Sequence, residues 1–363
     1  PWESRAPVCL GETNVRKRVC AYGLKGGKGR RTVLKMMAAI LLLVAILAGA
    51  VYSIWWSGRS SLLKDSNNPW SGSINSDADE IVAEEIDGVT YYYQPDILNI
   101  LCVGIDKEGE LTGIDYSGNS RGQSDAIFLV SLDLKKKDIR LITVPRDTVV
   151  NLEMYDVLGN YMGRTEGQIA LQYAYGDGMQ QSGELVTARV SEIFGTILIS
   201  GYAVLDLECI QILNDMIGGV DVTMDQDYTM LDEAFVEGET VHLTGEQTMH
   251  FVRNRDTEIP ASAYTRLDRQ KLYLEAFVKQ AKCAVKENIG LPVKILEEIR
   301  NYMVTDMSAS QILYLATEVV NYDLSGDGIY ILQGDIVDNN GYEWYYLNQD
   351  ALNDLKIRLF YTK

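Results

Sequence analysis

Histidine is scarce in this chain of 363 residues, which contains only His242 and His250. Serine–histidine triads and most catalytic zinc sites depend on histidine, so neither is expected. The cysteines also lack the spacing of a zinc site, and free buried thiols are favoured over disulfides because three of the five fall in apolar strand or helix patterns. These cysteines are Cys9, Cys20, Cys102, Cys209 and Cys283.

Loops with the full spacing of a nucleotide or calcium site are lacking too. Gly26-Gly27-Lys28-Gly29 has no strand before it and does not have the spacing of a phosphate-binding loop. Asp323-Leu324-Ser325-Gly326-Asp327-Gly328 lacks the spaced ligands and the closing glutamate of a calcium loop. Neither segment is therefore expected to form such a site.

Positive charge is in short supply beyond the N-terminus. The chain has a formal net charge of −18, and its first 35 residues carry nine Lys/Arg against two acids, which leaves about −25 for the remainder. A body this acidic repels nucleic-acid phosphates, so no nucleic-acid partner is expected. An anionic substrate would need a local cluster of arginines that opposes the global field.

Residues 36–56 form a long apolar run with no charged residue. A helix of roughly 20 such residues spans a bilayer. The run ends in Tyr52, Trp55 and Trp56, as at a membrane interface, and the basic residues 1–35 precede it. We predict a cytoplasmic tail at 1–35, a single-pass transmembrane helix at 36–56 and a body outside the cell membrane. The alternative is a cleaved signal peptide, which usually has a shorter apolar region ending in small residues.

The body follows a segment that shows no periodicity. Residues 57–95 are rich in Ser, Asn, Gly and Asp, which predicts a flexible extracellular stalk. Strands and helices then alternate to the end of the chain, which indicates one layered α/β domain at 96–363 that includes a C-terminal extension. Helical patterns cover 183–194, 207–217 and 265–285, and Thr244 with Gln247 has the spacing of a capping box.

Three apolar strands are bounded by polar residues that a buried strand does not need. Asp106 closes the first strand, Asp125 opens the second, and Arg146 and Asp147 follow the third. Ligands bind where the strands of an open α/β sheet meet loops, so these side chains are candidate site residues. The strands are predicted at 98–105, 126–132 and 139–144.

Arginines gather at the ends of elements in the second half of the chain. Arg253 and Arg255 are two apart, so on a strand both would point to one face. Arg266, Arg269 and Gln270 stand in the first turns of the long helix, where free backbone N–H groups favour anions. Guanidinium groups bind phosphate in bidentate fashion. These arginines, together with Arg146 after the third strand, therefore predict a diphosphate site. The alternative is that each arginine is a solvated surface residue.

Asp106 and Asp125 suggest a magnesium site. Mg²⁺ is usually held by one or two carboxylates together with substrate phosphates. The alternative is turn chemistry, because aspartate favours turns. Asp147 adjoins Arg146 in the sequence and is expected to orient it.

Eight short motifs, taken together and in this order, resemble the LytR-CpsA-Psr family over about residues 96–285. The basic tail, apolar run and stalk also resemble the layout of that family. The motifs are Asn99-Ile100-Leu101 leading to Asp106, Gly122-Gln123-Ser124-Asp125, Val144-Pro145-Arg146-Asp147-Thr148, Ala174-Tyr175-Gly176, Gly218-Gly219-Val220-Asp221-Val222, Leu243-Thr244-Gly245-Glu246-Gln247, Val252-Arg253-Asn254-Arg255 and Arg266-Leu267-Asp268-Arg269-Gln270.

The resemblance implies a central mixed β-sheet between helices, with an apolar pocket for a lipid. It implies a phosphotransferase that moves a glycopolymer, such as teichoic acid or capsule, from a polyprenyl-diphosphate carrier to peptidoglycan with Mg²⁺ as cofactor. Asp125, Arg146 and Asp147 are the candidate catalytic residues, and Asp106 and Asp125 the candidate magnesium ligands. The candidate diphosphate ligands are Arg146, Arg253, Arg255, Arg266, Arg269 and Gln270.

The chain departs from the family pattern in three places. Gln123 replaces an arginine, Gln168 stands where a lysine is usual, and Ser262-Ala263-Tyr264-Thr265 replaces an acidic residue. Two alternative functions stay open, and the substitutions at Gln123 and Gln168 bear on the second of them. One is a hydrolase of the same lipid diphosphate. The other is a non-catalytic binding or regulatory module of the cell envelope that holds the carrier lipid without turnover.

Overall fold

The computed structural model describes residues 49, 52–63, 83–86, 88–107, 109–113, 122–156, 158–254 and 262–363. The chain divides into two units, Pro1–Tyr52 and Ser53–Lys363, and only the second is described below. Within the described ranges, no helix combines the length and apolarity needed to cross a membrane. The predicted tail at 1–35 and most of the predicted span at 36–56 lie outside those ranges.

A six-stranded mixed sheet forms the centre of the unit, in the order β11-β8-β3-β4-β5-β12. β4 pairs antiparallel with both β3 and β5, whereas β8 runs parallel to β3 and β12 parallel to β5. The mixed sheet that the family resemblance implies is thereby confirmed. The strand bounds are β3 Ile97–Ile105, β4 Ser124–Asp133, β5 Asp138–Thr143, β8 Gly201–Leu205, β11 Met303–Thr305 and β12 Asp323–Ile331.

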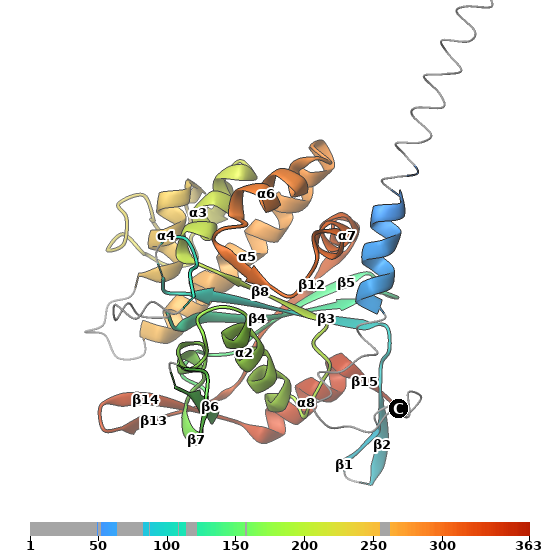
Figure 1. Cartoon of the computed structure of the whole chain (residues 1–363). Coiled ribbons are helices and arrows are strands. Elements are labelled where there is room, and N and C mark those ends of the chain that lie inside the picture. Colours follow the sequence, from blue (N-terminus) through green and yellow to red (C-terminus); the bar gives the residue numbers. More distant parts are fainter. Residues whose placement is uncertain are drawn as a thin grey trace, which may run out of the picture. The chain divides into compact units, whose positions relative to one another are not determined.

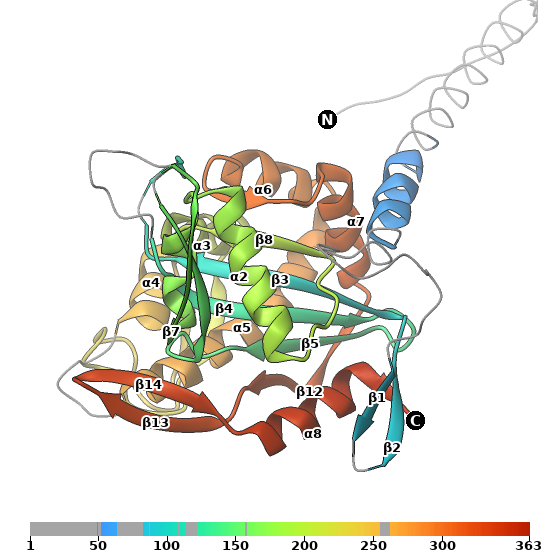
Figure 2. The ribbon, with the colours of Figure 1, turned by 60° about the horizontal axis from the view of Figure 1, so that its bottom comes forward.

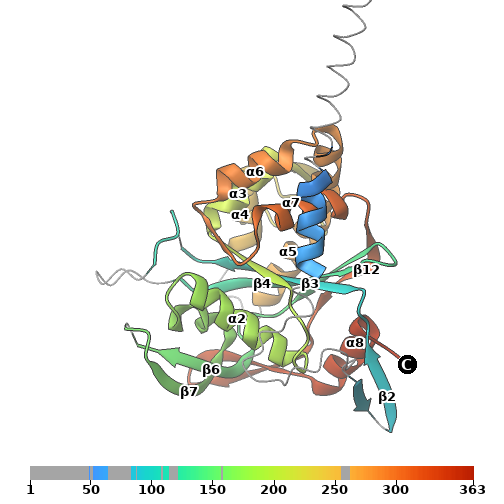
Figure 3. The same ribbon diagram turned by 45° about the vertical axis from the view of Figure 1, so that its right-hand side comes forward.

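Helices cover both faces of this sheet (Figure 1). α2 and α8 lie on one face, and α3 to α7 lie on the other, as the two turned views also show (Figures 2 and 3). The helix bounds are α2 Gln180–Ile193, α3 Leu207–Met216, α4 Gly245–Arg253, α5 Ser262–Glu287, α6 Leu291–Ile299, α7 Ala309–Val319 and α8 Gln349–Phe360.

The alternation of side chains along β3 explains the two layers. Leu101, Val103 and Ile105 pack with α2 and α8, whereas Leu98 and Ile100 pack toward α7. Successive side chains of a strand point to opposite faces, so a strand that is apolar at nearly every position is buried on both sides.

Smaller pieces surround the sheet. Two of them are hairpins at the candidate site described below: β13–β14 lines its cavity, and β6–β7 contributes Gln168, which donates a hydrogen bond to Asp147. Their bounds, with those of the other strands and 3₁₀ turns, are β1 Ala83–Ile86, β2 Val89–Tyr93, β6 Val149–Tyr155, β7 Tyr161–Gln168, η1 Ile169–Leu171, η2 Tyr173–Tyr175, β9 Val220–Thr223, β10 Thr240–Leu243, β13 Gly334–Asn339, β14 Tyr342–Leu347 and β15 Tyr361–Thr362.

The segment predicted as a flexible stalk contains regular structure where it is described. Residues 57–63 are helical, as are residues 53–56 of the predicted span before them, and this helix packs against α7. Leu62 is fully buried, and the ring of Trp55, in the predicted span, lies 5.4 Å from that of Tyr314. A Cβ atom on Gly58 would lie 2.1 Å from the carbonyl oxygen of Ser310, so only glycine permits this approach. β2 pairs with β15 at the other end of the segment. Composition alone missed these contacts because they join residues far apart in the sequence.

The described cysteines are free thiols, as expected, but they differ in exposure. Cys209 is buried and Cys102 is largely covered, whereas Cys283 is exposed on α5. Burial raises the pKa of the Cys102 thiol to about 11, so this thiol is protonated and inert at neutral pH.

Candidate functional site

The sheet topology brings the predicted carboxylates and Arg146 to one edge. Since β4 is antiparallel to both β3 and β5, the end of β3, the start of β4 and the end of β5 meet there. Asp106 directly follows β3, Asp125 is the second residue of β4, and Arg146 follows β5. Polar strand ends that are separated by up to 40 positions in the sequence therefore face one another.

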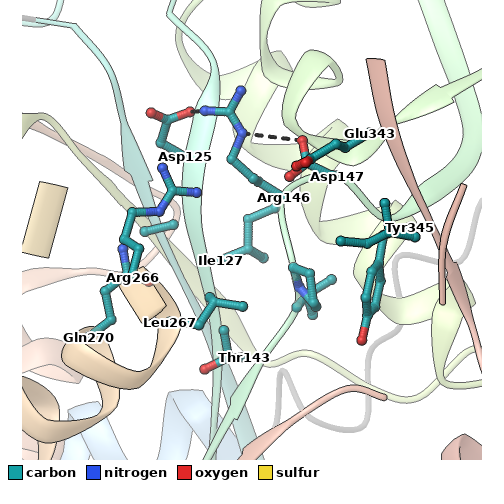
Figure 4. Close-up of a pocket in the computed structure, with 14 residues that line it drawn as sticks. Asp125, Ile127, Thr143, Arg146, Asp147, Arg266, Leu267, Gln270, Glu343 and Tyr345 are labelled. Carbon is teal, nitrogen blue, oxygen red and sulfur yellow. Dashed lines mark hydrogen bonds and ion pairs between the residues drawn. The ribbon is translucent and has the colours of Figure 1, made fainter. Parts of the chain in front are cut away.

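Arg146 lies between two carboxylates (Figure 4). Its Nη1 donates a hydrogen bond to Asp125 Oδ1, and its Nε is 3.5 Å from Asp147 Oδ1. Asp147 Oδ1 also accepts a hydrogen bond from Gln168 Nε2 at 2.9 Å, and the same amide donates to the carbonyl oxygen of Glu343 at 2.8 Å. Asp147 therefore contacts Arg146 as an orienting group would, and Gln168 fixes Asp147.

The charges around Asp125 act on it in opposite directions. Burial raises the pKa of the Asp125 carboxyl, and the nearby charges of Asp106 and Asp147 raise it further, whereas Arg146 and Arg266 lower it. The pKa of Asp125 is raised on balance. A carboxylate with a raised pKa is a better proton acceptor at neutral pH than one at its ordinary value.

Asp106 marks the boundary of the loop between β3 and β4. Its Oδ1 accepts a hydrogen bond from the backbone N–H of Gln123 at 2.5 Å, and its own N–H donates to the carbonyl oxygen of Gln123 at 3.1 Å. Gln123, where the family has arginine, therefore contacts the carboxylate through its backbone.

The first turns of α5 contribute Arg266 and Gln270 to the opposite wall (Figure 4). Arg266 is only 8% exposed, and Gln270 Nε2 donates to the carbonyl oxygen of Val252 at 3.1 Å. Arg269 does not line this wall. It donates a hydrogen bond to the backbone oxygen of Asn254, and its guanidinium carbon lies 5.4 Å from the ring centre of Tyr228.

The expected strand at Arg253 is wrong, because α4 continues through this residue. Thr244 and Gln247 form the capping box, and buried residues recur with helical spacing at Thr248, Met249 and Val252. Arg253 is exposed and lines a separate groove between α3 and α4. Arg255 lies outside the described residues.

A narrow cavity lies among these groups. Its volume is about 30 Å³, and its lining combines Asp125, Arg146, Asp147, Arg266 and Gln270 with aliphatic and aromatic side chains. The remaining lining residues are Ala126, Ile127, Thr143, Val144, Pro145, Leu267, Ile336, Glu343 and Tyr345. In this conformation the cavity has room for little more than one water molecule.

The β13–β14 hairpin was not foreseen as part of the site. It contributes Ile336, Glu343 and Tyr345, and the Tyr345 N–H donates to the carbonyl oxygen of Asp147 at 2.9 Å. Asn340 and Gly341 join the two strands with positive φ angles of 56° and 88°. An Asn-Gly pair between alternating residues is the strongest short-range hairpin signal, so the sequence did contain a sign of this element.

The side chains present are compatible with a magnesium ion that substrate would help to hold. Within the described part of the chain, no group of three or more His, Cys, Asp or Glu residues is arranged to bind a metal. Asp106 and Asp125 interact electrostatically, since the charge of Asp106 raises the pKa of Asp125. Two carboxylates suffice for Mg²⁺ when phosphate oxygens and water complete its coordination.

The arrangement as a whole suits an apolar molecule with an anionic head. Two guanidinium groups, Arg146 and Arg266, lie at the mouth of an apolar cavity, and Asp125 adjoins both. Guanidinium groups can hold phosphate oxygens, and the carboxylate can accept a proton.

Comparison with known proteins supports the resemblance seen in the sequence. The model of the LytR_cpsA_psr family matches residues 70–360. A relative from Bacillus mycoides (strain KBAB4), named polyisoprenyl-teichoic acid–peptidoglycan teichoic acid transferase TagU, is 27% identical over 70% of this chain and 79% of its own length. A relative of the same name from Bacillus cereus (strain AH820) is 25% identical over 89% of this chain and 96% of its own.

Solved structures share the fold. TagT bound to LI-WTA superposes with a TM-score of 0.54 at 20% identity, over 73% of this chain and 89% of TagT. B. subtilis TagV gives a TM-score of 0.54 at 21% identity, over 73% of this chain and 96% of TagV.

Proposed function

This chain belongs to the LytR-CpsA-Psr family, and we propose that it is a phosphotransferase that moves a glycopolymer from a polyprenyl-diphosphate carrier to peptidoglycan. The names of its relatives support teichoic acid as the glycopolymer and a polyisoprenyl group as the carrier. The single observation in this chain that carries the proposal is the pairing of Arg146 with Asp125 beside Arg266 at the mouth of an apolar cavity.

Donor binding would change the partner of Arg146. A diphosphate offers oxygens that accept bidentate hydrogen bonds from guanidinium groups, so Arg146 and Arg266 would turn to it. Asp125 would then lose the contact that lowers its pKa, and its pKa would rise further. The diphosphate would thereby prepare the proton acceptor for the next step.

The transfer itself requires one bond to form and one to break. The acceptor sugar hydroxyl attacks the phosphorus that carries the glycopolymer, and its proton passes to Asp125. The bond from that phosphorus to the bridging oxygen breaks, and polyprenyl phosphate leaves. The product is a phosphodiester between glycopolymer and acceptor. Asp147, fixed by Gln168, keeps Arg146 oriented, and Arg146 and Arg266 stabilise the charge on the phosphates.

Asp106 and Asp125 would hold magnesium, which would neutralise charge on the leaving phosphate. Mg²⁺ on one carboxylate oxygen would lower the proton affinity of the other, so Asp106 would carry most of the metal contact while Asp125 receives the proton. The cavity must also widen, because ligand pockets usually measure about 300–1,000 Å³. The β13–β14 hairpin and the first turns of α5 supply the walls of the cavity that are not part of the six-stranded sheet.

The decisive test is a labelled polyprenyl-diphosphate donor, incubated with and without peptidoglycan oligomers. We expect a sugar–phosphodiester product only with the acceptor. Free glycopolymer phosphate in both reactions, with no such link, would instead identify a hydrolase.

Arg146→Ala and Asp125→Asn should each lower kcat/KM about 100-fold or more, since the first removes charge stabilisation and the second removes the proton acceptor. Arg358, whose guanidinium group lies over the ring of Tyr330, provides the matched control, and Arg358→Ala should leave kcat/KM unchanged.

We also propose that the chain is a single-pass protein of the cell membrane, with residues 1–35 in the cytoplasm and the catalytic domain outside. The apolar run at 36–56 and its basic flank support this orientation. A reporter fused after residue 360 should be active only when the reporter functions outside the cell. Activity of a cytoplasm-specific reporter at that position would overturn the orientation.

A further inference from the structure

A second and larger concavity lies between α3 and α4, which are neighbours on the same face of the sheet (Figures 1 and 2). This α3–α4 groove has a volume of about 530 Å³, within the range of ligand sites. Its polar lining comprises Glu208 and Gln211 of α3 with Glu246, His250, Arg253 and Asn254 at or near α4.

The groove adjoins the carboxylate side of the site described above. α3 begins directly after β8, whose carboxyl end lies at the same sheet edge as that of β3 because the two strands are parallel. The N–H of Leu207, a residue that lines the groove, donates to the carbonyl oxygen of Lys107 at 3.4 Å. Lys107 is the residue after Asp106, so this backbone hydrogen bond places one end of the groove next to the segment that carries Asp106.

The same end adjoins the arginine side, because α3 and α4 run in opposite directions: the last turn of α3 meets the start of α4, where the N–H of Gly245 donates to Asp215 Oδ1 at 2.8 Å. Arg269 donates a hydrogen bond to the backbone oxygen of Asn254, which lines the groove. Gln270, which lines the narrow cavity, donates to the backbone oxygen of Val252 at 3.1 Å. The α3–α4 groove is therefore separated from the diphosphate mouth by the end of α4 and the first turns of α5.

The chemistry of the groove suits an uncharged saccharide. Carboxylates accept hydrogen bonds, Arg253 donates them, and the amides of Gln211 and Asn254 do both, as a ring of hydroxyl groups requires. Ile212 and Met249 supply apolar surface for the C–H faces of a sugar. Two glutamates against one arginine oppose a polyanion, so the phosphate-rich chain of a teichoic acid donor fits poorly.

We propose that the α3–α4 groove binds the glycan of the peptidoglycan acceptor and delivers its hydroxyl to Asp125. The proposal rests on the transferase function proposed above. It assigns the two substrates to different places, with the donor diphosphate at Arg146 and Arg266 and the acceptor glycan over α3 and α4.

The test is the double variant Gln211→Ala/His250→Ala of the whole chain. Steady-state transfer is measured with soluble peptidoglycan glycan oligomers and a short-chain prenyl-diphosphate donor, each varied in turn. We expect the acceptor KM to rise at least about fivefold, the loss of about 1 kcal/mol of hydrogen bonding, with the donor KM within about twofold of the wild type. His242→Ala and Gln349→Ala, at exposed positions that do not line the groove, should change neither constant.

Calorimetric titration with the same glycan oligomers gives a readout that does not need turnover. Binding should weaken at least about fivefold in the double variant and in the conservative, exposed Glu246→Gln. A rise in the donor KM alone would assign the groove to the donor glycopolymer, and unchanged binding and acceptor KM would leave it without a role. Both results overturn the proposal. Glycan binding by a wild type that transfers nothing would uphold the groove and refute the transferase.

Discussion

At the scale of single residues, Asp206 carries a buried charge that should make stability depend on pH. Asp206 is 1% exposed and caps α3, where its Oδ1 accepts a hydrogen bond from the N–H of Cys209 at 3.0 Å. Its Oδ2 has no hydrogen-bond partner among the described residues. Burial raises the pKa of Asp206 to about 6, so in the folded state the carboxyl stays protonated up to about that pH and carries a buried charge above it.

The sign of the effect follows from linkage. A group whose pKa is raised by folding stabilises the protein below its unfolded pKa, and this contribution is lost as the pH rises through the folded pKa. The unfolding free energy of the wild type should fall between about pH 4 and about pH 6 relative to Asp206→Asn, which keeps the capping oxygen. Above pH 7 the variant should be more stable by on the order of 1–2 kcal/mol. Denaturant titrations of both proteins across this pH range measure the difference. If the unfolding free energies of the wild type and of Asp206→Asn change in parallel with pH, the effect does not come from Asp206.

Gln168 supports Arg146 indirectly, because it donates a hydrogen bond to Asp147, which lies beside the guanidinium group. Gln168→Ala removes the hydrogen bonds to Asp147 Oδ1 and to the Glu343 carbonyl oxygen, so Asp147 is no longer fixed beside Arg146. We expect kcat to fall about fivefold, as for the loss of about 1 kcal/mol of supporting hydrogen bonding. A Gln168→Lys change should restore part of the rate, because lysine can donate to the same carboxylate. If only the melting temperature changes, Gln168 is structural.

The sequence predicted which residues stand at the strand ends, but not every side-chain direction. Arg266 and Gln270 are four apart on α5 and share a face, as expected. Arg269 is one residue from Gln270, and a helix turns by about 100° per residue, so Arg269 faces Tyr228 rather than the cavity. Its role as a diphosphate ligand stays a prediction that this geometry does not favour.

At the scale of elements, the β13–β14 hairpin offers a clean separation of stability from function. Gly341 and Gly238 both have positive φ, 88° and 80°, and an added Cβ would touch nothing within 4 Å at either. Gly341→Ala and Gly238→Ala should each destabilise by about 1 kcal/mol through backbone strain. Only Gly341→Ala should raise the donor KM, since only this turn supports Ile336, Glu343 and Tyr345 in the cavity wall. Equal KM values in the two variants would exclude the hairpin from donor binding.

Elements with strong apolar periodicity were predicted well. β3, β4 and β5 begin and end within about two residues of the expected bounds, and α3 and α5 do so within about three. The β6–β7 and β13–β14 hairpins were missed because their residues are mostly exposed or half-buried, which leaves little alternation to read. Three of the fourteen residues in the cavity wall, Ile336, Glu343 and Tyr345, therefore could not be foreseen from the hydrophobic pattern, although Asn340-Gly341 marked their turn.

At the scale of the whole molecule, the net charge of about −25 beyond residue 35 opposes the approach of an anionic donor. Raising the salt concentration to about 150 mM shortens the Debye length to about 8 Å, which screens distant charges more than the paired arginines at the site. We therefore expect the KM for a short-chain donor to fall about twofold between about 20 mM and about 150 mM salt. A KM that rises with salt would show that the local attraction of Arg146 and Arg266 outweighs the global repulsion.

The order of strands could not be derived from the chain, because it depends on pairing over long distances. β12 lies parallel to β5 with Asp323 opposite Asp138, and β8 lies parallel to β3. Local pattern contains no record of such partners. The family resemblance predicted a mixed sheet, and the structure shows the order of its strands.

The late position of β12 bears on how the protein is made. β3, β4 and β5 are joined by antiparallel pairing and can form as soon as residue 143 has left the ribosome or the secretion channel. Until residue 331 follows, β5 presents an open edge with the buried side chains Ile139, Leu141 and Ile142. Uncovered apolar edges recruit strands from other chains, so nascent molecules should be prone to aggregate during this interval. A chain that stops before β12 would keep the carboxylates and Arg146 but lose the strand that closes the sheet, and it should be found in aggregates rather than as a partly active enzyme.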